Sequence, residues 1–147
     1  MKKHLFILFF LFLSIASAQE WATNFEKAKK IASEEKKSIV LVFQGSDWCA
    51  PCIKLEKEIW SAPTFIKSAK DSFVLLKADF PRKKSNKLTE EQRNHNNALA
   101  EKYNPKGYFP YVVVLTNEGA FLGATGYEKI SPEAYFNTLT AFTNQNP

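Results

Sequence analysis

The sequence predicts an α/β fold in which a mixed four-stranded sheet is flanked by helices. Two apolar runs, at 38–43 and 72–79, are typical of strands buried on both faces, and helical sequence separates them. Such a strand–helix–strand unit gives parallel strands joined by a right-handed crossover. Two later strands, at 111–116 and 120–125, are joined by the turn sequence Asn-Glu-Gly, which predicts an antiparallel hairpin.

Helices are predicted around these strands from capping residues and from apolar residues at helical spacing. The first has Thr23 as its capping residue and reaches about Glu35. The second begins at Cys49, with Pro51 in its first turn, where a missing N–H group has no cost. Further helices are expected at 63–69, at 89–103 with Thr89 as cap, and from 132 onward with Ser131 as cap.

The composition is that of one packed domain. Of the 147 residues, 45% are hydrophobic and 14% are aromatic, which is enough to form a core. The formal net charge is +5, but no basic block is long enough to form a nucleic-acid-binding arm. We therefore expect no nucleic-acid partner.

The first 18 residues have the pattern of a secretory signal peptide. Lysines precede an apolar run at 5–13, and the small residues at 16–18 fit a cleavage site. We expect residues 1–18 to be removed, which leaves 19–147 as a periplasmic or secreted domain without stable membrane insertion. The alternative is a retained anchor, although the apolar segment is short for crossing about 30 Å of hydrocarbon.

Cys49 and Cys52 are the two cysteines of the chain. As a structural disulfide, the pair would close a very short loop, which removes little entropy from the unfolded chain. A structural zinc site needs four Cys or His ligands, and the expected mature chain adds only His95, for which we expect a solvated or partly packed position. We therefore predict redox chemistry, with no bound metal or cofactor.

A cysteine at a helix start lies near unpaired backbone N–H groups and the positive end of the helix dipole. Both favour the thiolate, which is the attacking species in disulfide exchange. Cys49 is therefore predicted to be the exposed nucleophile. Cys52, nearly one turn later, is predicted to be the shielded thiol that resolves the mixed disulfide.

Three stretches resemble the thioredoxin family, over about residues 38–142. WCAPC at 48–52 resembles its active-site motif, GYFPYVVVL at 107–115 its cis-proline segment, and TGYEKIS at 125–131 the segment after its hairpin. The resemblance implies a thioredoxin fold and a cis bond before Pro110. The substrate-binding residues that it implies are Trp48, Pro51, Phe109, Pro110 and Gly126. FQGSDWCAPC and the long segment 79–103 are most similar to the exported bacterial thioredoxin-like branch.

The chain also departs from that family. Typical thioredoxins carry a buried acid in the strand before the cysteines, and the strand at 38–43 has none. Asp47 is near Cys49, but we expect a solvated loop residue beside the helix start, where Asp is favoured in any case. Lys77 matches a family lysine near the active site, although a lysine at a strand end usually faces solvent.

These patterns predict a secreted or periplasmic thiol–disulfide oxidoreductase that reduces or isomerises protein disulfides. Its partners would be protein dithiols and disulfides, together with a membrane electron-donor protein. The uncharged Ala50-Pro51 pair and the acid Asp47 favour a potential nearer about −270 mV than about −120 mV. The alternative is a non-enzymatic, redox-sensitive binding module with an exposed aromatic patch at Trp48, Tyr108, Phe109 and Tyr111.

Overall fold

A four-stranded sheet forms the centre of the fold, and the computed structural model describes residues 20–144 of the chain. The strands are β1 (Ser38–Gln44), β2 (Phe73–Asp79), β3 (Tyr111–Leu115) and β4 (Phe121–Thr125), in the spatial order β2-β1-β3-β4. β1 and β2 are parallel, whereas the β1–β3 and β3–β4 pairs are antiparallel. The predicted mixed four-stranded sheet is confirmed.

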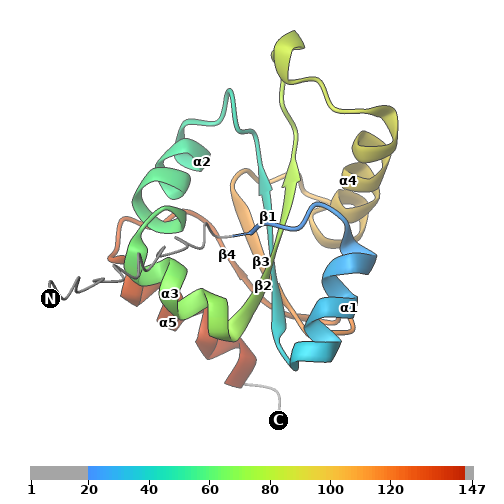
Figure 1. The fold of residues 1–147 in the computed structure, drawn as a ribbon. Coiled ribbons are helices and arrows are strands. Elements are labelled where there is room, and N and C mark those ends of the chain that lie inside the picture. The colour runs from blue at the N-terminus through green and yellow to red at the C-terminus, as the bar shows by residue number, and fades with distance from the viewer. Residues whose placement is uncertain (1–19, 145–147) are drawn as a thin grey trace, which may run out of the picture.

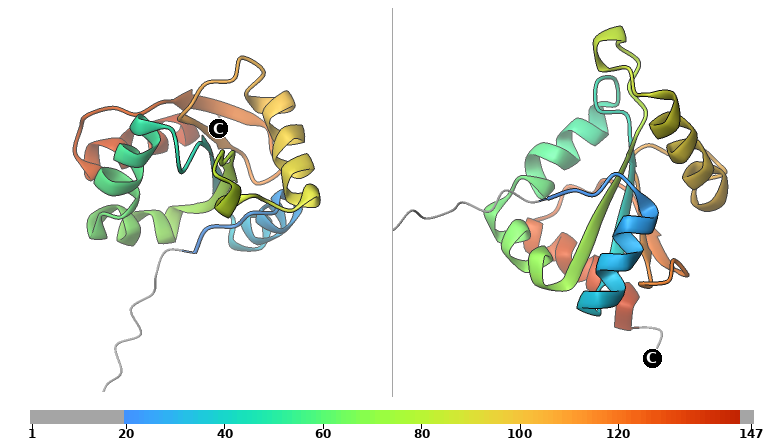
Figure 2. Two further views of the ribbon diagram at one scale, coloured as in Figure 1. Left: turned by 90° about the horizontal axis from the view of Figure 1, so that it is seen from above. Right: turned by 45° about the vertical axis from the view of Figure 1, so that its right-hand side comes forward.

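Helices cover both faces of this sheet (Figure 1; Figure 2). One face carries α1 (Phe25–Glu35) and α4 (Glu90–Tyr103), and the other carries α2 (Ala50–Leu55), α3 (Pro63–Ser72) and α5 (Pro132–Asn144). Each face has its own hydrophobic core, and β1 contributes to both. Val40 and Val42 lie in the core under α2, α3 and α5, whereas Ile39, Leu41 and Phe43 lie in the core under α1 and α4. This is why the β1 sequence is apolar at consecutive positions.

Two of the predicted helix caps are confirmed. The Thr89 hydroxyl accepts a hydrogen bond from the Gln92 N–H at the start of α4, and the Ser131 hydroxyl accepts one from the Ala134 N–H at the start of α5. Each side chain pairs one of the backbone donors that a helix start leaves without a partner.

The predicted cap of α1 is wrong by one residue. Asn24, not Thr23, is the capping residue, and its side chain accepts from the Lys27 N–H. Thr23 still belongs to an extended segment, because Ala22 forms a parallel bridge with Leu76 of β2. The Thr23 carbonyl accepts from the Gln92 side chain of α4 instead.

The second helix has two parts. α2 continues directly into the π-helical turn η1 (Glu56–Trp60), and α3 follows from Pro63 and ends three residues later than the predicted residue 69. The loop after β2 also contains a short 3₁₀ turn, η2 (Lys84–Asn86). Figure 1 shows the start of α2 and the η2 loop together at the carboxyl ends of β1 and β2. This end of the sheet holds the candidate site.

His95 joins the two helices on one face of the sheet. Its Nε2 atom accepts a hydrogen bond of 3.0 Å from the Phe25 N–H, the first residue of α1. The side chain is half-buried, in agreement with the predicted partly packed position. The neighbouring Asn96 is buried, and its amide donates to the Asp79 carbonyl at the end of β2.

The predicted signal peptide, residues 1–18, lies outside the described residues. Between residues 20 and 144, no helix has both the length and the apolar character needed to cross a bilayer.

Candidate active site

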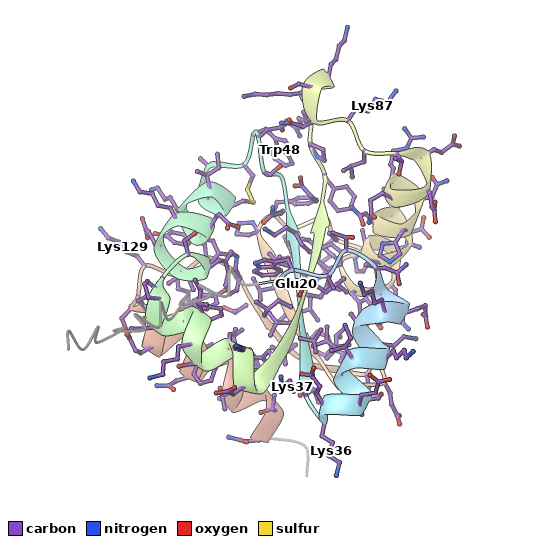
Figure 3. The ribbon with its side chains drawn as sticks, viewed as in Figure 1. Glu20, Lys36, Lys37, Trp48, Lys87 and Lys129 are labelled. Atoms are coloured by element: carbon purple, nitrogen blue, oxygen red, sulfur yellow. A yellow bond between two sulfur atoms is a disulfide. The ribbon has the colours of Figure 1, made fainter. Side chains whose placement is uncertain are left out.

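Cys49 and Cys52 form a disulfide at the start of α2, and Figure 3 shows this bond close to Trp48. Cys49 is the capping residue of the helix, and its sulfur accepts a hydrogen bond of 3.3 Å from the Cys52 N–H. The Cα atoms of the pair are 5.2 Å apart. In the reduced protein, the same N–H would stabilise a thiolate on Cys49.

The prediction that Cys49 is exposed is wrong for this oxidised form. Cys49 is 4% exposed and Cys52 is 3% exposed, so exposure does not distinguish the two residues. The physical reason is that the Cys49 sulfur is bonded to Cys52 and also faces the Cys52 N–H. The difference between them is positional, because Cys49 caps the helix and Cys52 lies inside its first turn.

Trp48 closes one side of the active-site loop. Its indole lies directly against Gly45, where an added Cβ would come within 2.2 Å of the ring, so only glycine leaves room for it. The indole N–H donates a 2.7 Å hydrogen bond to the Phe80 carbonyl. The Gly45 carbonyl in turn accepts from the Cys49 N–H, which forms the turn that leads into α2.

Asp47 holds the loop after β2, and the prediction that it is merely solvated is wrong. Its carboxylate accepts hydrogen bonds from the Arg82 N–H (2.9 Å), the Lys83 N–H (3.0 Å) and the Asn86 amide (2.9 Å). The Arg82 backbone bond is the main cause of a lowered pKa for Asp47, with desolvation acting in the opposite direction. The negative charge of Asp47 is therefore stabilised by hydrogen bonds from residues 82, 83 and 86.

The segment before β3 lies beside Trp48 and β4. The Phe109–Pro110 peptide bond is cis. The Phe109 ring contacts the rings of Trp48 and Phe80 edge-to-face, with centroids 5.4 and 5.5 Å away. Gly126 lies next to this segment, because a Cβ there would be 3.6 Å from the Pro110 carbonyl oxygen.

The structure therefore brings the predicted substrate-binding residues together as two contacting pairs. Trp48 contacts Phe109, and Gly126 contacts Pro110. The 3.6 Å spacing at Gly126 is an ordinary contact, so the space there does not require glycine. Pro51 is exposed in the first turn of α2, as a helix-starting proline.

A cavity of about 480 Å³ adjoins Cys52. Cys52, Gln44, Glu56 and Lys77 all contribute to its lining. The Lys77 ammonium lies 3.2 Å from a carboxylate oxygen of Glu56 and 4.6 Å from the centre of the Trp21 ring. The Lys77 side chain is only 22% exposed, so the prediction that it faces solvent is wrong.

Glu56 is the site residue that sequence reasoning missed. In typical thioredoxins the acid lies in the strand before the cysteines, and this strand has none. Glu56 instead follows Cys52 by four residues on the continuing helix, and its N–H donates to the Cys52 carbonyl. The helical spacing i, i+4, which places both side chains on one face, was the signal that could have identified it.

Within residues 20–144, no three His, Cys, Asp or Glu side chains are grouped as metal ligands.

Comparisons with known proteins agree with this geometry. A family model described as thioredoxin-like matches residues 20–116. The disulfide bond reductase DsbH of Chlamydia pneumoniae is 35% identical over 125 residues, which cover 85% of this chain and 74% of that protein. A solved structure of a DsbH oxidoreductase has a TM-score of 0.80 at 32% identity and covers 89% of both chains.

One further relative matches less of the sequence, and one solved structure shares the fold. The thioredoxin-related protein DsbJ of Chlamydia pneumoniae is 29% identical, and the match spans 72% of this chain but only 32% of DsbJ. The oxidised C-terminal domain of Neisseria meningitidis DsbD shares the fold, with a TM-score of 0.55 at 19% identity over 83% of this chain and 91% of that domain. The predicted thioredoxin fold is thus confirmed. The chain belongs to the thioredoxin-like family, as a member that carries the cysteine pair of a thiol–disulfide oxidoreductase.

Proposed function

We propose that the protein is an exported disulfide reductase or isomerase that acts on protein substrates in the periplasm. The observation that carries the proposal is the Cys49–Cys52 pair at the start of α2, with the Cys52 N–H on the Cys49 sulfur. The reductase named among its relatives supports the reducing direction. The charged signal-like start of the sequence supports export.

The reaction begins when the Cys49 thiolate attacks one sulfur of a substrate disulfide. A mixed disulfide forms, and the other substrate sulfur leaves as a thiolate that takes up a proton. Cys52 then loses its proton and attacks the Cys49 sulfur, which breaks the mixed disulfide and releases the second substrate sulfur as a thiolate that takes up a proton. The products are the Cys49–Cys52 disulfide and a substrate with two thiols, so two electrons have passed to the substrate.

Glu56 is placed to accept the proton that Cys52 loses. Its carboxylate lines the same cavity as Cys52, and Lys77 pairs with it at 3.2 Å. By accepting the Cys52 proton across this shared cavity, the Glu56 carboxylate would raise the fraction of Cys52 thiolate during the second step. Glu56 would thus do what the buried strand acid does in typical thioredoxins.

The substrate would bind over Trp48, Pro51 and the Phe109–Pro110 segment, with Gly126 beside it. The edge of this surface is formed by exposed Pro51 and by half-buried Trp48 and Phe109. Regeneration needs a dithiol donor, because the reaction leaves the protein oxidised. In an oxidising compartment, we propose that a membrane electron-donor protein supplies this dithiol.

The test is reduction of insulin, followed as turbidity, with dithiothreitol as the electron source. We expect turnover well above the rate of dithiothreitol alone. Absence of turnover would instead support a redox-sensitive binding module. Equilibration with glutathione tests the direction, and a midpoint above about −180 mV would make the protein an oxidant and not a reductase.

A further inference from the structure

The loop after β2 forms a cationic surface beside Trp48, the residue before Cys49. It surrounds a cavity of about 300 Å³, at the lower end of the size of ligand pockets. The cationic side chains that line the cavity are Arg82, Lys83, Lys84, Lys87 and Arg93. We call these five residues and their cavity the cationic pocket. Figure 3 shows Lys87 and Trp48 at the same end of the molecule.

The positive charges of the cationic pocket exceed the negative charges around them. Among residues 20–144, none of its five cations forms a salt bridge, and all five are exposed. Asp79 also lines the cavity, but both its carboxylate oxygens are engaged by Ser46, through the backbone N–H and the hydroxyl. Five cations therefore stand against the carboxylates of Asp79 in the lining and of Asp47 beside Lys83, and the pocket presents an excess of positive charge to solvent.

The pocket also has an apolar part. Phe80, Pro81 and Leu88 contribute to its lining, and each of them is only partly exposed. A polyanion that carries charge alone would leave this apolar surface in water. The combination fits a polypeptide segment in which an apolar side chain is flanked by Asp or Glu.

The cationic pocket is physically joined to the active site. The Arg82 guanidinium lies 3.7 Å above the Trp48 ring, and the Trp48 indole donates to the Phe80 carbonyl. Asp47, two residues before Cys49, holds the backbone of Arg82 and Lys83. A chain that occupies the pocket would therefore continue past Trp48 to the disulfide.

We infer that the cationic pocket docks an acidic segment of the protein whose disulfide is reduced. The inference rests on the proposed function, since it names the substrate class of the same site. Complementary charge would act mainly on the rate of encounter and on the choice of substrate.

The test is binding of two cysteine-free fluorescent peptides of equal length to the oxidised protein, measured by anisotropy. One carries Glu and Asp around a Leu residue, and the other has Gln and Asn in their place. We expect the acidic peptide to bind about tenfold more tightly at low salt. The preference should largely disappear when salt is raised from about 50 mM to about 500 mM, because screening shortens the range of the charges.

Two matched variants test whether the cationic pocket causes the preference for the acidic peptide. The triple variant K83E/K84E/K87E should lose it, whereas K30E/K67E/K70E, which reverses three exposed lysines on α1 and α3, should keep it. Figure 1 shows both helices at the other end of the sheet. Equal binding of the two peptides, or an equal loss in both variants, would overturn the inference.

The remaining outcomes separate the docking surface from the chemistry. If the acidic peptide is preferred but insulin is not reduced, the docking surface stands and the proposed function fails. If insulin is reduced but neither peptide binds, the function stands and the docking surface fails. Tighter binding to vesicles of anionic phospholipid than to the acidic peptide would also overturn the inference.

Discussion

The Lys77 ammonium lies 3.2 Å from the Glu56 carboxylate, and both side chains line the cavity beside Cys52. Glu56 comes from the helix that follows the cysteines and Lys77 from the neighbouring strand β2. The Glu56 side chain is 45% exposed, so the pair contributes little to stability and its consequence is expected in catalysis.

Glu56→Gln should slow the resolution of the mixed disulfide by about tenfold at neutral pH, since an amide cannot accept the Cys52 proton. Rapid acid quenching followed by mass spectrometry would measure how much mixed disulfide is present at each time. The slowed step should recover as the pH rises and Cys52 ionises without help. Glu101→Gln, on an exposed part of α4, is the matched control. An unchanged resolution rate in Glu56→Gln would remove Glu56 from the mechanism.

Cys49→Ser should abolish disulfide exchange, and Cys52→Ser should accumulate mixed disulfides with its substrates. The reason is that Cys49 caps the helix and Cys52 supplies the second attack. Alkylation of the reduced protein, followed by peptide mapping, checks the order of reactivity. Faster labelling of Cys52 than of Cys49 would reverse the two roles.

The Arg82 N–H should report the titration of Asp47. The hydrogen bonds to Asp47 lower its pKa below the ordinary value of 3.8. A lowered pKa in the folded state means that these contacts persist above that pKa and are lost as the pH falls through it. We expect the amide resonance of Arg82 to shift with a midpoint below 3.8 in an NMR titration. Asp47→Asn should remove the transition, and a midpoint above 3.8 would contradict the hydrogen-bonded geometry.

Tyr135→Phe should destabilise the protein by about 1–2 kcal/mol. Tyr135 is a residue of α5, and its side chain is fully buried in the core. Its hydroxyl donates a 2.8 Å hydrogen bond to the Gly126 carbonyl. Burial also raises the pKa of Tyr135, so the hydroxyl remains a donor at every physiological pH. Urea unfolding measures the change. Tyr127→Phe, which removes an exposed hydrogen bond to Glu58, should cost less than Tyr135→Phe.

The exported protein should begin at Gln19. The basis is the small-residue sequence at 16–18 after an apolar run. N-terminal sequencing of the protein from the periplasmic fraction provides the measurement. A full-length chain recovered with membranes would show a retained anchor.

The sequence by itself determined the elements and the reacting pair. Consecutive apolar residues in the β1 sequence predicted a strand buried on both faces, because a strand with a core on each face must be apolar at every position. Thr89 and Ser131 marked helix starts, because capping depends on residues only three apart. The spacing of Cys49 and Cys52 predicted the redox pair, because the two residues are also only three positions apart.

Only the tertiary structure decided what surrounds that pair. The Asp47 bonds to Arg82 and Lys83 join residues 35 and 36 positions apart, and Glu56 and Lys77 are 21 positions apart. Such contacts form because the parallel pairing of β1 with β2 brings both carboxyl ends to one end of the sheet. No local pattern encodes which loop side chains then meet. The cap of α1 is Asn24 and not Thr23 because of another long-range contact. Ala22 pairs with Leu76 of β2, which keeps the chain before Asn24 extended.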